Sequence, residues 1–186
     1  ELPDCSALVP GCTNPDAFNY DETATIDDGT CELPCTDVVM TVTTDCYPDE
    51  TGWSVVDAEG NVLASVDEGT YQDDATEFVW TGCLTNACLT LTVTDSYGDG
   101  LGGSVWFGCN VDGDYALTTP DGLVLASMGE ANFGSSVSHE VCLPPVPGCT
   151  NEAACNYDAE ATADDGTCLV EGESCDDGDS ETVLEL

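Results

Sequence analysis

The chain has 186 residues, of which 38 are acidic, one is histidine and none is lysine or arginine, so its formal net charge is −38. An average chain of this length carries roughly twenty basic residues. Side chains here can form an ion pair only through His139. Nucleic acids and anionic membrane surfaces are bound through basic footprints. The charge therefore excludes both kinds of partner.

The 13 cysteines and the 41% hydrophobic fraction distinguish this chain from disordered acidic proteins. Cysteines at regular spacings predict a disulfide framework, which requires an oxidising compartment. No apolar run approaches the ~18 residues of a membrane span, so no membrane insertion is expected. Neither an initiator Met nor a signal-peptide pattern is present. We expect an extracellular or cell-surface protein, as a mature chain or as a fragment of a longer one.

The first element in chain order is an acidic repeat that returns near the other end. Residues 11–31 read GCTNPDAFNYDETATIDDGTC and residues 148–168 read GCTNEAACNYDAEATADDGTC, with 15 of 21 positions identical. Cys5 and Cys142 each lie seven residues before the first cysteine of a repeat. The predicted parts of the chain are a first module at 1–34, a middle domain at 35–143, a second module at 144–175 and a tail at 176–186.

The middle segment alternates apolar and polar residues with a period of two and has no helical stripe. Nine short runs rich in Val, Thr and aromatic residues, one of them SVWF at 104–107, are separated by turn signals such as EGN, GDG and PDG. A weaker duplication is also present, because 41–65 resembles 92–100 followed by 115–127. The predicted class is mainly β: an antiparallel, jelly-roll-like β-sandwich of eight or nine strands flanked by two small disulfide-rich, calcium-loop-like modules.

The motif GCTN…NYD…DDGTC resembles a short acidic repeat found in tandem in large secreted proteins of marine and freshwater microbes, Bacteroidota prominent among them. The middle segment, with TDCYPDETGW and TDSYGDG, is similar to a duplicated β-domain found beside those repeats. The closing GESCDDGDSETV resembles a further element of such proteins, but Leu184 stands where an acidic residue is usual. The resemblance covers nearly the whole chain. It implies a modular architecture, an extracellular location and calcium binding, and it implies no reaction.

Acidic loops supply the candidate metal ligands. Calcium takes about six to eight oxygens from carboxylates, amides and backbone carbonyls on tightly turned loops. Zinc is a poorer candidate, because the chain has one histidine and its cysteines are expected in bridges. The alternative interpretation is that the acidic side chains are solvated and confer only solubility. The predicted calcium ligands are Asn19, Asp21, Asp27, Asp28, Asn156, Asp158, Asp164 and Asp165 in the repeats, and Asp45, Asp49, Glu50, Asp95 and Asp99 in the middle segment.

The duplication also favours one disulfide pairing among those that the six middle-domain cysteines allow. It is the pairing that closes the two halves equivalently. The predicted bridges are Cys35–Cys83 and Cys88–Cys142 within the halves, Cys46–Cys109 between them, Cys12–Cys31 and Cys149–Cys168 within the repeats, and Cys155–Cys175 beside the second repeat. Cys5 is then the odd cysteine, either free or bonded to another chain or to another part of a longer chain.

Catalytic interpretations have little support, and we expect no enzyme. His139, the sole imidazole, lies in the alternating run SSVSHEVC and is expected to be an exposed strand residue. Each of the three tryptophans, Trp53, Trp80 and Trp106, lies in an apolar run, so core packing is favoured over a sugar-stacking platform.

The expected function is structural: a subunit or segment of an extracellular filament or surface fibre, stabilised by disulfides and calcium. Copies of the same chain would join head to tail, because the segment around Cys5 is equivalent to the last predicted strand of a middle domain and suits addition to a neighbour's sheet edge. The C-terminal TVLEL is a second such segment. The alternative is a carbohydrate-binding or adhesive accessory region of a large secreted protein, with glycans as partners and both termini as linker ends.

Overall fold

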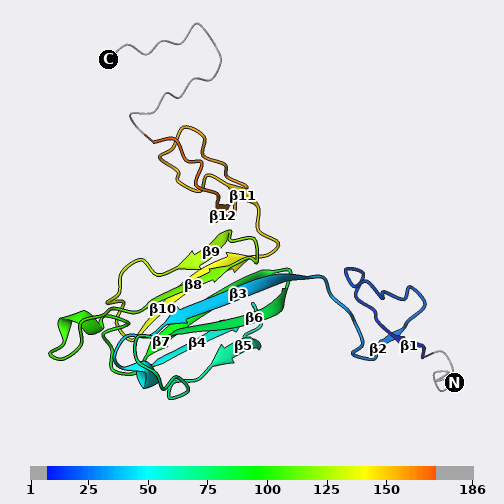
Figure 1. Cartoon of the computed structure of the whole chain (residues 1–186). Coiled ribbons are helices and arrows are strands. Elements are labelled where there is room, and N and C mark those ends of the chain that lie inside the picture. The colour runs from blue at the N-terminus through cyan, green and yellow to red at the C-terminus, as the bar shows by residue number, and fades with distance from the viewer. Residues whose placement is uncertain (1–7, 171–186) are drawn as a thin grey trace, which may run out of the picture.

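The structure, a computed structural model, describes residues 8–170 and has two four-stranded antiparallel sheets at its centre (Figure 1). The predicted mainly-β class and the sandwich are confirmed. None of the helices within the described residues is long and apolar enough to cross a membrane. The sandwich strands are β3 (Cys35–Thr43), β4 (Thr51–Val56), β5 (Val62–Val66), β6 (Glu77–Thr85), β7 (Cys88–Asp95), β8 (Asp114–Thr118), β9 (Val124–Ser127) and β10 (Ser136–Cys142).

The two sheets are related by the duplication in the sequence. One sheet has the order β10-β7-β4-β5 and the other the order β6-β3-β8-β9. Exchanging β3–β6 with β7–β10, strand for strand, converts the first order into the second. Each sheet therefore combines the outer strands of one half with the inner strands of the other, and the chain crosses between sheets as it does in jelly rolls.

The core is built from the alternating inner faces of the strands. In β3, Val38, Met40 and Val42 are each 1% exposed, as expected for a half-buried strand with a period of two. Trp53 packs edge-on against Trp80, with ring centroids 5.4 Å apart, and both belong to the core or its margin. Burial of such a side chain stabilises the fold by about 1.5–3 kcal/mol. Core packing is confirmed for these two tryptophans.

The sandwich has eight strands, within the predicted eight or nine, and the run SVWF is the candidate strand that does not form. The turn η3 (Gly103–Val105) occupies its start, and the Phe107 side chain is fully exposed. Glycines interrupt the segment on both sides, and Gly100 and Gly108 adopt positive φ values of 71° and 100°. Backbone in that region cannot continue a strand ladder. Trp106 is consequently 41% exposed and is not a core residue.

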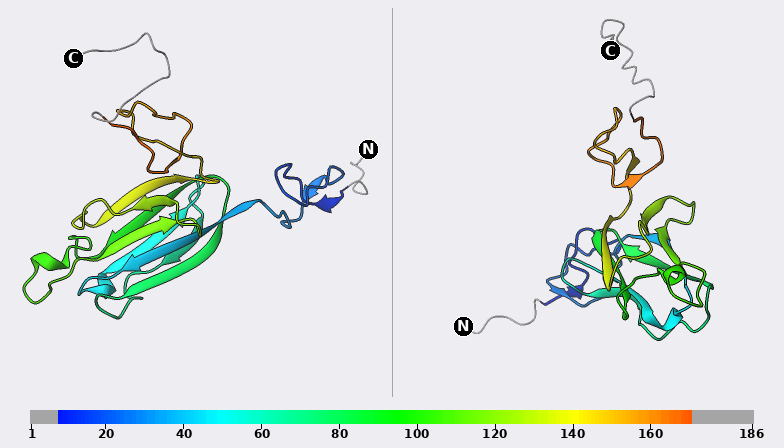
Figure 2. Two further views of the ribbon diagram at one scale, coloured as in Figure 1. Left: turned by 45° about the horizontal axis from the view of Figure 1, so that its top comes forward. Right: turned by 90° about the vertical axis from the view of Figure 1, so that its left-hand side faces the viewer.

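The two ends of the sandwich carry different segments: connecting loops meet at one end, and the repeat modules are attached at the other. The loops that follow β3 and β7 meet at one end, because Thr43 pairs with Asp114 and Thr51 pairs with Asp95. The first of these loops contains the turn η2 (Pro48–Glu50). The chain enters β3 and leaves β10 at the opposite end, where the two repeat modules are attached (Figure 2).

The modules share one small framework. In the first, β1 (Pro10–Gly11) pairs in parallel with β2 (Ile26–Asp27), and in the second β11 (Pro147–Gly148) pairs with β12 (Ala163–Asp164). The second module contacts β9 of the sandwich through β12. The first module projects from the start of β3 (Figure 2).

The disulfides follow the predicted pairing, and a disulfide framework of this density suits an extracellular protein. Cys155 is also disulfide-bonded. Its predicted partner Cys175, the odd Cys5 and the TVLEL segment lie outside the described residues. The confirmed bridges are Cys12–Cys31, Cys35–Cys83, Cys46–Cys109, Cys88–Cys142 and Cys149–Cys168.

Candidate functional site

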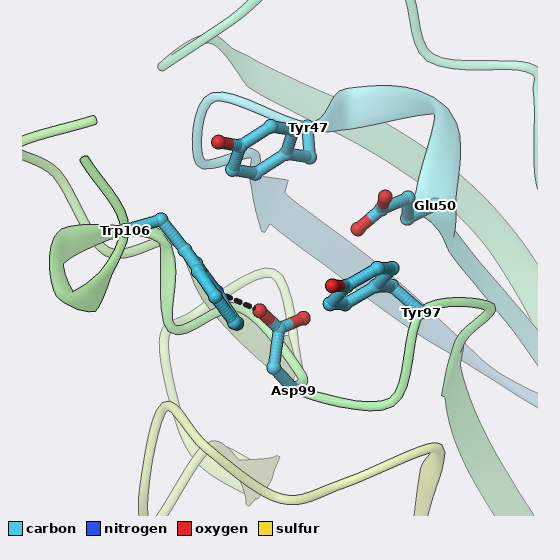
Figure 3. A pocket seen from close by; sticks show the side chains of 5 residues that line it. All are labelled: Tyr47, Glu50, Tyr97, Asp99 and Trp106. Atoms are coloured by element: carbon cyan, nitrogen blue, oxygen red, sulfur yellow. Dashed lines mark hydrogen bonds between the residues drawn. The ribbon is translucent and has the colours of Figure 1, made fainter. Parts of the chain in front are cut away.

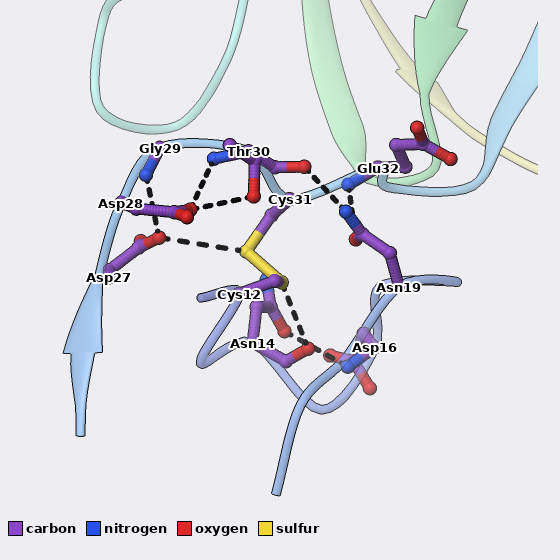
Figure 4. Close-up of a disulfide and its surroundings, with 10 residues drawn as sticks. All are labelled: Cys12, Asn14, Asp16, Asn19, Asp27, Asp28, Gly29, Thr30, Cys31 and Glu32. Carbon is purple, nitrogen blue, oxygen red and sulfur yellow. Dashed lines mark hydrogen bonds between the residues drawn. A yellow bond between two sulfur atoms is a disulfide. The ribbon is translucent and has the colours of Figure 1, made fainter. Parts of the chain in front are cut away.

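The acidic side chains of the first repeat turn back onto their own loop (Figure 4). Asp28 Oδ1 accepts hydrogen bonds from the Thr30 amide at 3.0 Å and from the Thr30 hydroxyl at 2.6 Å. Asp27 Oδ1 accepts one from the Gly29 amide at 3.0 Å. Asp21 makes the same kind of turn with Thr23, and these bonds, from the hydroxyl first and then the amide, lower the pKa of Asp21. Such bonds stabilise tight turns whether or not an ion is bound.

Asn19 braces this loop from the other side. Its Nδ2 donates to the Thr30 carbonyl at 2.6 Å, and its Oδ1 accepts from the Glu32 amide at 2.8 Å. Both polar atoms of the side chain are therefore engaged with the backbone next to Cys31. Asn19, which the sequence predicts to be a metal ligand, therefore stabilises the loop that the Cys12–Cys31 disulfide closes.

The second repeat reproduces this network. Asn156 Nδ2 donates to the Thr167 carbonyl at 2.8 Å, and Asn156 Oδ1 accepts from the Leu169 amide at 2.8 Å. Asp165 Oδ1 accepts from both the hydroxyl and the amide of Thr167, which lowers the pKa of Asp165. In the same way, Asp158 accepts a hydrogen bond from the Glu160 amide, and Asp164 accepts one from the Gly166 amide.

Among residues 8–170, carboxylates converge in a group of three at a single place, which lies in the sandwich. The candidate ligand atoms of Glu50, Asp95 and Asp99 all lie within 4.8 Å of one another. A second group of that spacing includes the sulfurs of Cys88 and Cys142, which are bonded to each other and are not free to bind metal. The calcium loops of the repeats remain predictions.

The converging carboxylates come from the two loops that the strand order brings together. Glu50 ends η2 in the loop after β3, Asp95 is the last residue of β7, and Asp99 follows in the next loop. Asp45 lies beside them in the first loop, and the charges of Asp95 and Asp99 act on it. Asp49, in η2, is exposed.

Most of this group is buried. Asp45 is 3% exposed, Asp95 is 2% exposed and Asp99 is 9% exposed. Loop amides orient two of the carboxylates: Asp45 Oδ1 accepts from the Tyr47 amide at 2.7 Å, and Asp95 Oδ1 accepts from the Asp99 amide at 3.1 Å. Burying carboxylates together, without a positive side chain, is unfavourable unless they are protonated or bind a cation.

The electrostatics of the site reflect that conflict. Burial, with a further contribution from the charges of Asp95 and Asp99, raises the pKa of Glu50 to about 7. Burial also raises the pKa of Asp45 and the pKa of Asp95, against the hydrogen bonds from loop amides that lower them. The chain contains no lysine or arginine to offset these charges.

Aromatic side chains form the mouth of the site. Tyr47, Tyr97 and Trp106, together with Glu50 and Asp99, line a cavity of about 170 Å³ (Figure 3). Trp106 Nε1 donates a hydrogen bond to Asp99 Oδ2, and the Trp106 ring meets Tyr97 edge-on with centroids 5.7 Å apart. The two tyrosines are equivalent positions of the duplicated DCY and DSY motifs.

His139 lies apart from this site. The sequence predicts an exposed side chain here, but the His139 side chain is half-buried. It shares the inner face of β10 with Val137 and Val141, because alternate residues of a strand face the same side. Its Nε2 is 2.7 Å from the Tyr115 hydroxyl, and burial lowers the pKa of His139.

Comparison with known proteins gives no family assignment, since no family model, curated protein or solved structure matches the chain.

Proposed function

We propose that the chain is a structural segment of an extracellular filament or surface fibre, held together by disulfides and calcium. The observation that carries this proposal is the covalent path between the two ends of the described chain. Cys35 is the first residue of β3 and Cys142 is the last residue of β10, so the sandwich is bridged where the chain enters and leaves it.

Tension applied through the modules follows the disulfides and bypasses the folded parts. The path leaves the backbone at Cys12 and rejoins it at Cys31, then crosses from Cys35 to Cys83 and from Cys88 to Cys142. It leaves again at Cys149 and rejoins at Cys168. Only short connections, such as residues 83–88, carry load as backbone. Both sheets and all the candidate calcium loops lie in the bypassed segments.

Sheet edges offer a means of joining copies. Among residues 8–170, strand β6 pairs only with β3 and no other strand covers the second edge of its nine residues; Val79 in β6 is 57% exposed. Unpaired edges of this kind accept added strands. Cys5, the centre of the predicted N-terminal donor, and the second donor TVLEL lie outside the described residues.

Force spectroscopy on the full chain tests the load path. Pulled from its ends without reductant, the oxidised chain should release neither sandwich half. With reductant it should gain the length closed by the Cys35–Cys83 and Cys88–Cys142 bridges, which span 48 and 54 positions, equivalent to about 170 Å and 190 Å at ~3.5 Å per residue, in addition to the two shorter module loops. Full extension without reductant would contradict the proposal.

Assembly is tested by negative-stain microscopy in calcium. Fibres are expected from the full chain, and deletion of residues 1–10 should abolish them while near-ultraviolet circular dichroism shows the sandwich intact. Dispersed particles from the full chain, or fibres from the truncated one, would exclude head-to-tail joining through this segment.

A second candidate function is carbohydrate binding, favoured by the aromatic mouth of the sandwich-end cavity. Tyr97 is 66% exposed and Trp106 is 41% exposed, and the two rings meet edge-on at one cavity. Aromatic faces beside carboxylates suit a hydroxyl-rich ring. A glycan array should then give hits that Trp106→Ala loses and Trp53→Phe keeps.

A further inference from the structure

Two acidic loops from different halves of the duplicated sandwich meet in one group. The first half contributes Asp45 and Glu50, and the second contributes Asp95 and Asp99. The disulfide Cys46–Cys109 joins the same two loops. Asp45 and Asp95 begin the two motifs and are 50 positions apart in the sequence, whereas the strand order places the motifs together.

The spacing of this group fits a shared ion. Two oxygens that each lie about 2.4 Å from one calcium ion are at most about 4.8 Å apart. The ligand atoms of Glu50, Asp95 and Asp99 meet that limit for every pair. The carboxylate of Asp45 adds negative potential beside them.

A buried hydroxyl provides independent evidence for a ligand here. Thr51 is 1% exposed, and its Oγ1 is the one buried side-chain oxygen or nitrogen among the described residues that lacks a hydrogen-bond partner. Thr51 pairs directly with Asp95 across β4 and β7, so the two side chains stand on the same face about 4.5–5.5 Å apart at Cβ. An unsatisfied buried hydroxyl is unfavourable, and a cation beside Asp95 would satisfy it.

An entry route is also present. Tyr47, Tyr97 and Trp106 line a cavity together with Glu50 and Asp99, and this cavity brings solvent to the two carboxylates (Figure 3). Water entering there can complete the coordination of a hard cation, which rarely has all its ligands from protein.

We infer that one calcium ion binds between the two halves of the sandwich, coordinated by Glu50, Asp95 and Asp99 with the Thr51 hydroxyl as a further oxygen donor. The inference rests on the proposed function in one respect, namely that calcium neutralises the acidic loops, and it assigns that role to a single composite site. The ion and the Cys46–Cys109 bridge then hold the same pair of loops together.

Calcium titration by calorimetry of the chelator-treated full chain tests this site. Asp95→Asn, which keeps the size and hydrogen-bonding shape of the side chain, should bind one calcium ion fewer than the parent chain. Asp121→Asn is the matched control, because Asp121 is exposed in the β8–β9 turn at the opposite end of the sandwich. It should lose none. Equal stoichiometry and affinity in Asp95→Asn and the parent would overturn the inference.

A second measurement guards against misfolding of the variant. Without calcium, Asp95→Asn should melt at or above the temperature of the parent, because one buried charge has been removed. Added calcium should raise Tm in the parent and in Asp121→Asn. In Asp95→Asn the rise in Tm should be smaller, because this site no longer contributes to it. A calcium-dependent rise of equal size in Asp95→Asn would count against the site.

The two proposals fail separately. If the parent chain forms fibres and Asp95→Asn keeps every bound calcium ion, the composite site is wrong and the structural function stands. If calcium binds as inferred but no fibres form, the site stands and the filament proposal falls.

Discussion

The acidic loops of the repeat modules and the acidic end of the sandwich contain similar residues in very different surroundings. In the modules, Asp28 and Asp165 are exposed, and one carboxylate oxygen of each accepts a hydrogen bond from an amide of its own tight turn. At the sandwich end, Asp45 and Asp95 are almost fully buried next to other carboxylates. A carboxylate in water costs nothing to keep ionised, but a buried group needs a counter-charge. Sequence motif alone therefore does not distinguish the two kinds of acidic loop, whereas the tertiary arrangement does.

The largest expected difference is the effect of chelation on the two regions. A ligand that binds only the folded state adds about 2.7 kcal/mol at a hundredfold excess over Kd. EDTA should therefore lower Tm of the sandwich clearly, and it should change the amide spectrum of the β3–β4 and β7–β8 loops more than that of residues 11–31. An unchanged Tm in EDTA would contradict calcium stabilisation of the fold.

A pH titration of the calcium-free protein should show the next largest effect. The pKa of Glu50 rises from its usual 4.5 to about 7, so the folded state holds a proton that the unfolded state releases. Stability from this group is complete below about pH 4.5 and falls as the pH rises through 7. The raised pKa values of Asp45 and Asp95 act in the same direction.

Calcium should reverse this dependence, because protons compete with the ion for the same oxygens. With calcium present, Tm should rise between pH 4.5 and 7. Chemical denaturation at several pH values, with Glu50→Gln as the comparison, measures both curves. A Glu50→Gln variant whose calcium-free stability falls as steeply as that of the parent would contradict the assignment to Glu50.

The smallest expected change in stability is in the modules, where two asparagine side chains hydrogen-bond the backbone of the acidic loops. Asn19→Ala removes the acceptor of the Glu32 amide, and Asn156→Ala removes that of the Leu169 amide. Loss of one such hydrogen bond costs about 1 kcal/mol, equivalent to about fivefold faster amide exchange. Exchange of these two amides should speed up equally in calcium and in EDTA. Calcium-dependent protection in the parent modules would show that the loops bind metal after all.

Much of the fold follows from pattern in the sequence. Alternation of apolar and polar residues identifies both β3 and β7, because a half-buried strand requires a period of two. Val38 and Met40 follow this period in β3, and Leu91 belongs to the corresponding series in β7. The disulfides are predictable because the duplication imposes one pairing on both halves. Repeat identity likewise predicts equal modules.

The composite site is not readable in the same way. Glu50 and Asp95 are 45 positions apart in the sequence, and only the crossing of the chain between sheets places β4 beside β7. Trp106 is misassigned to the core because SVWF looks like a strand when its glycine neighbours are ignored. The useful signal was the cluster of glycines around it, which predicts an irregular loop.

The covalent path through the disulfides also governs what a protease can do to this protein. A single cut anywhere in residues 36–82 or 89–141 leaves both ends of the chain connected through Cys35–Cys83 and Cys88–Cys142. The exposed loop around Phe107 is a natural place for such a cut. Severing the chain requires cleavage of one of the short segments between bridges, such as residues 84–87, where β6 turns directly into β7. A fibre of the proposed kind would survive nicking without shortening.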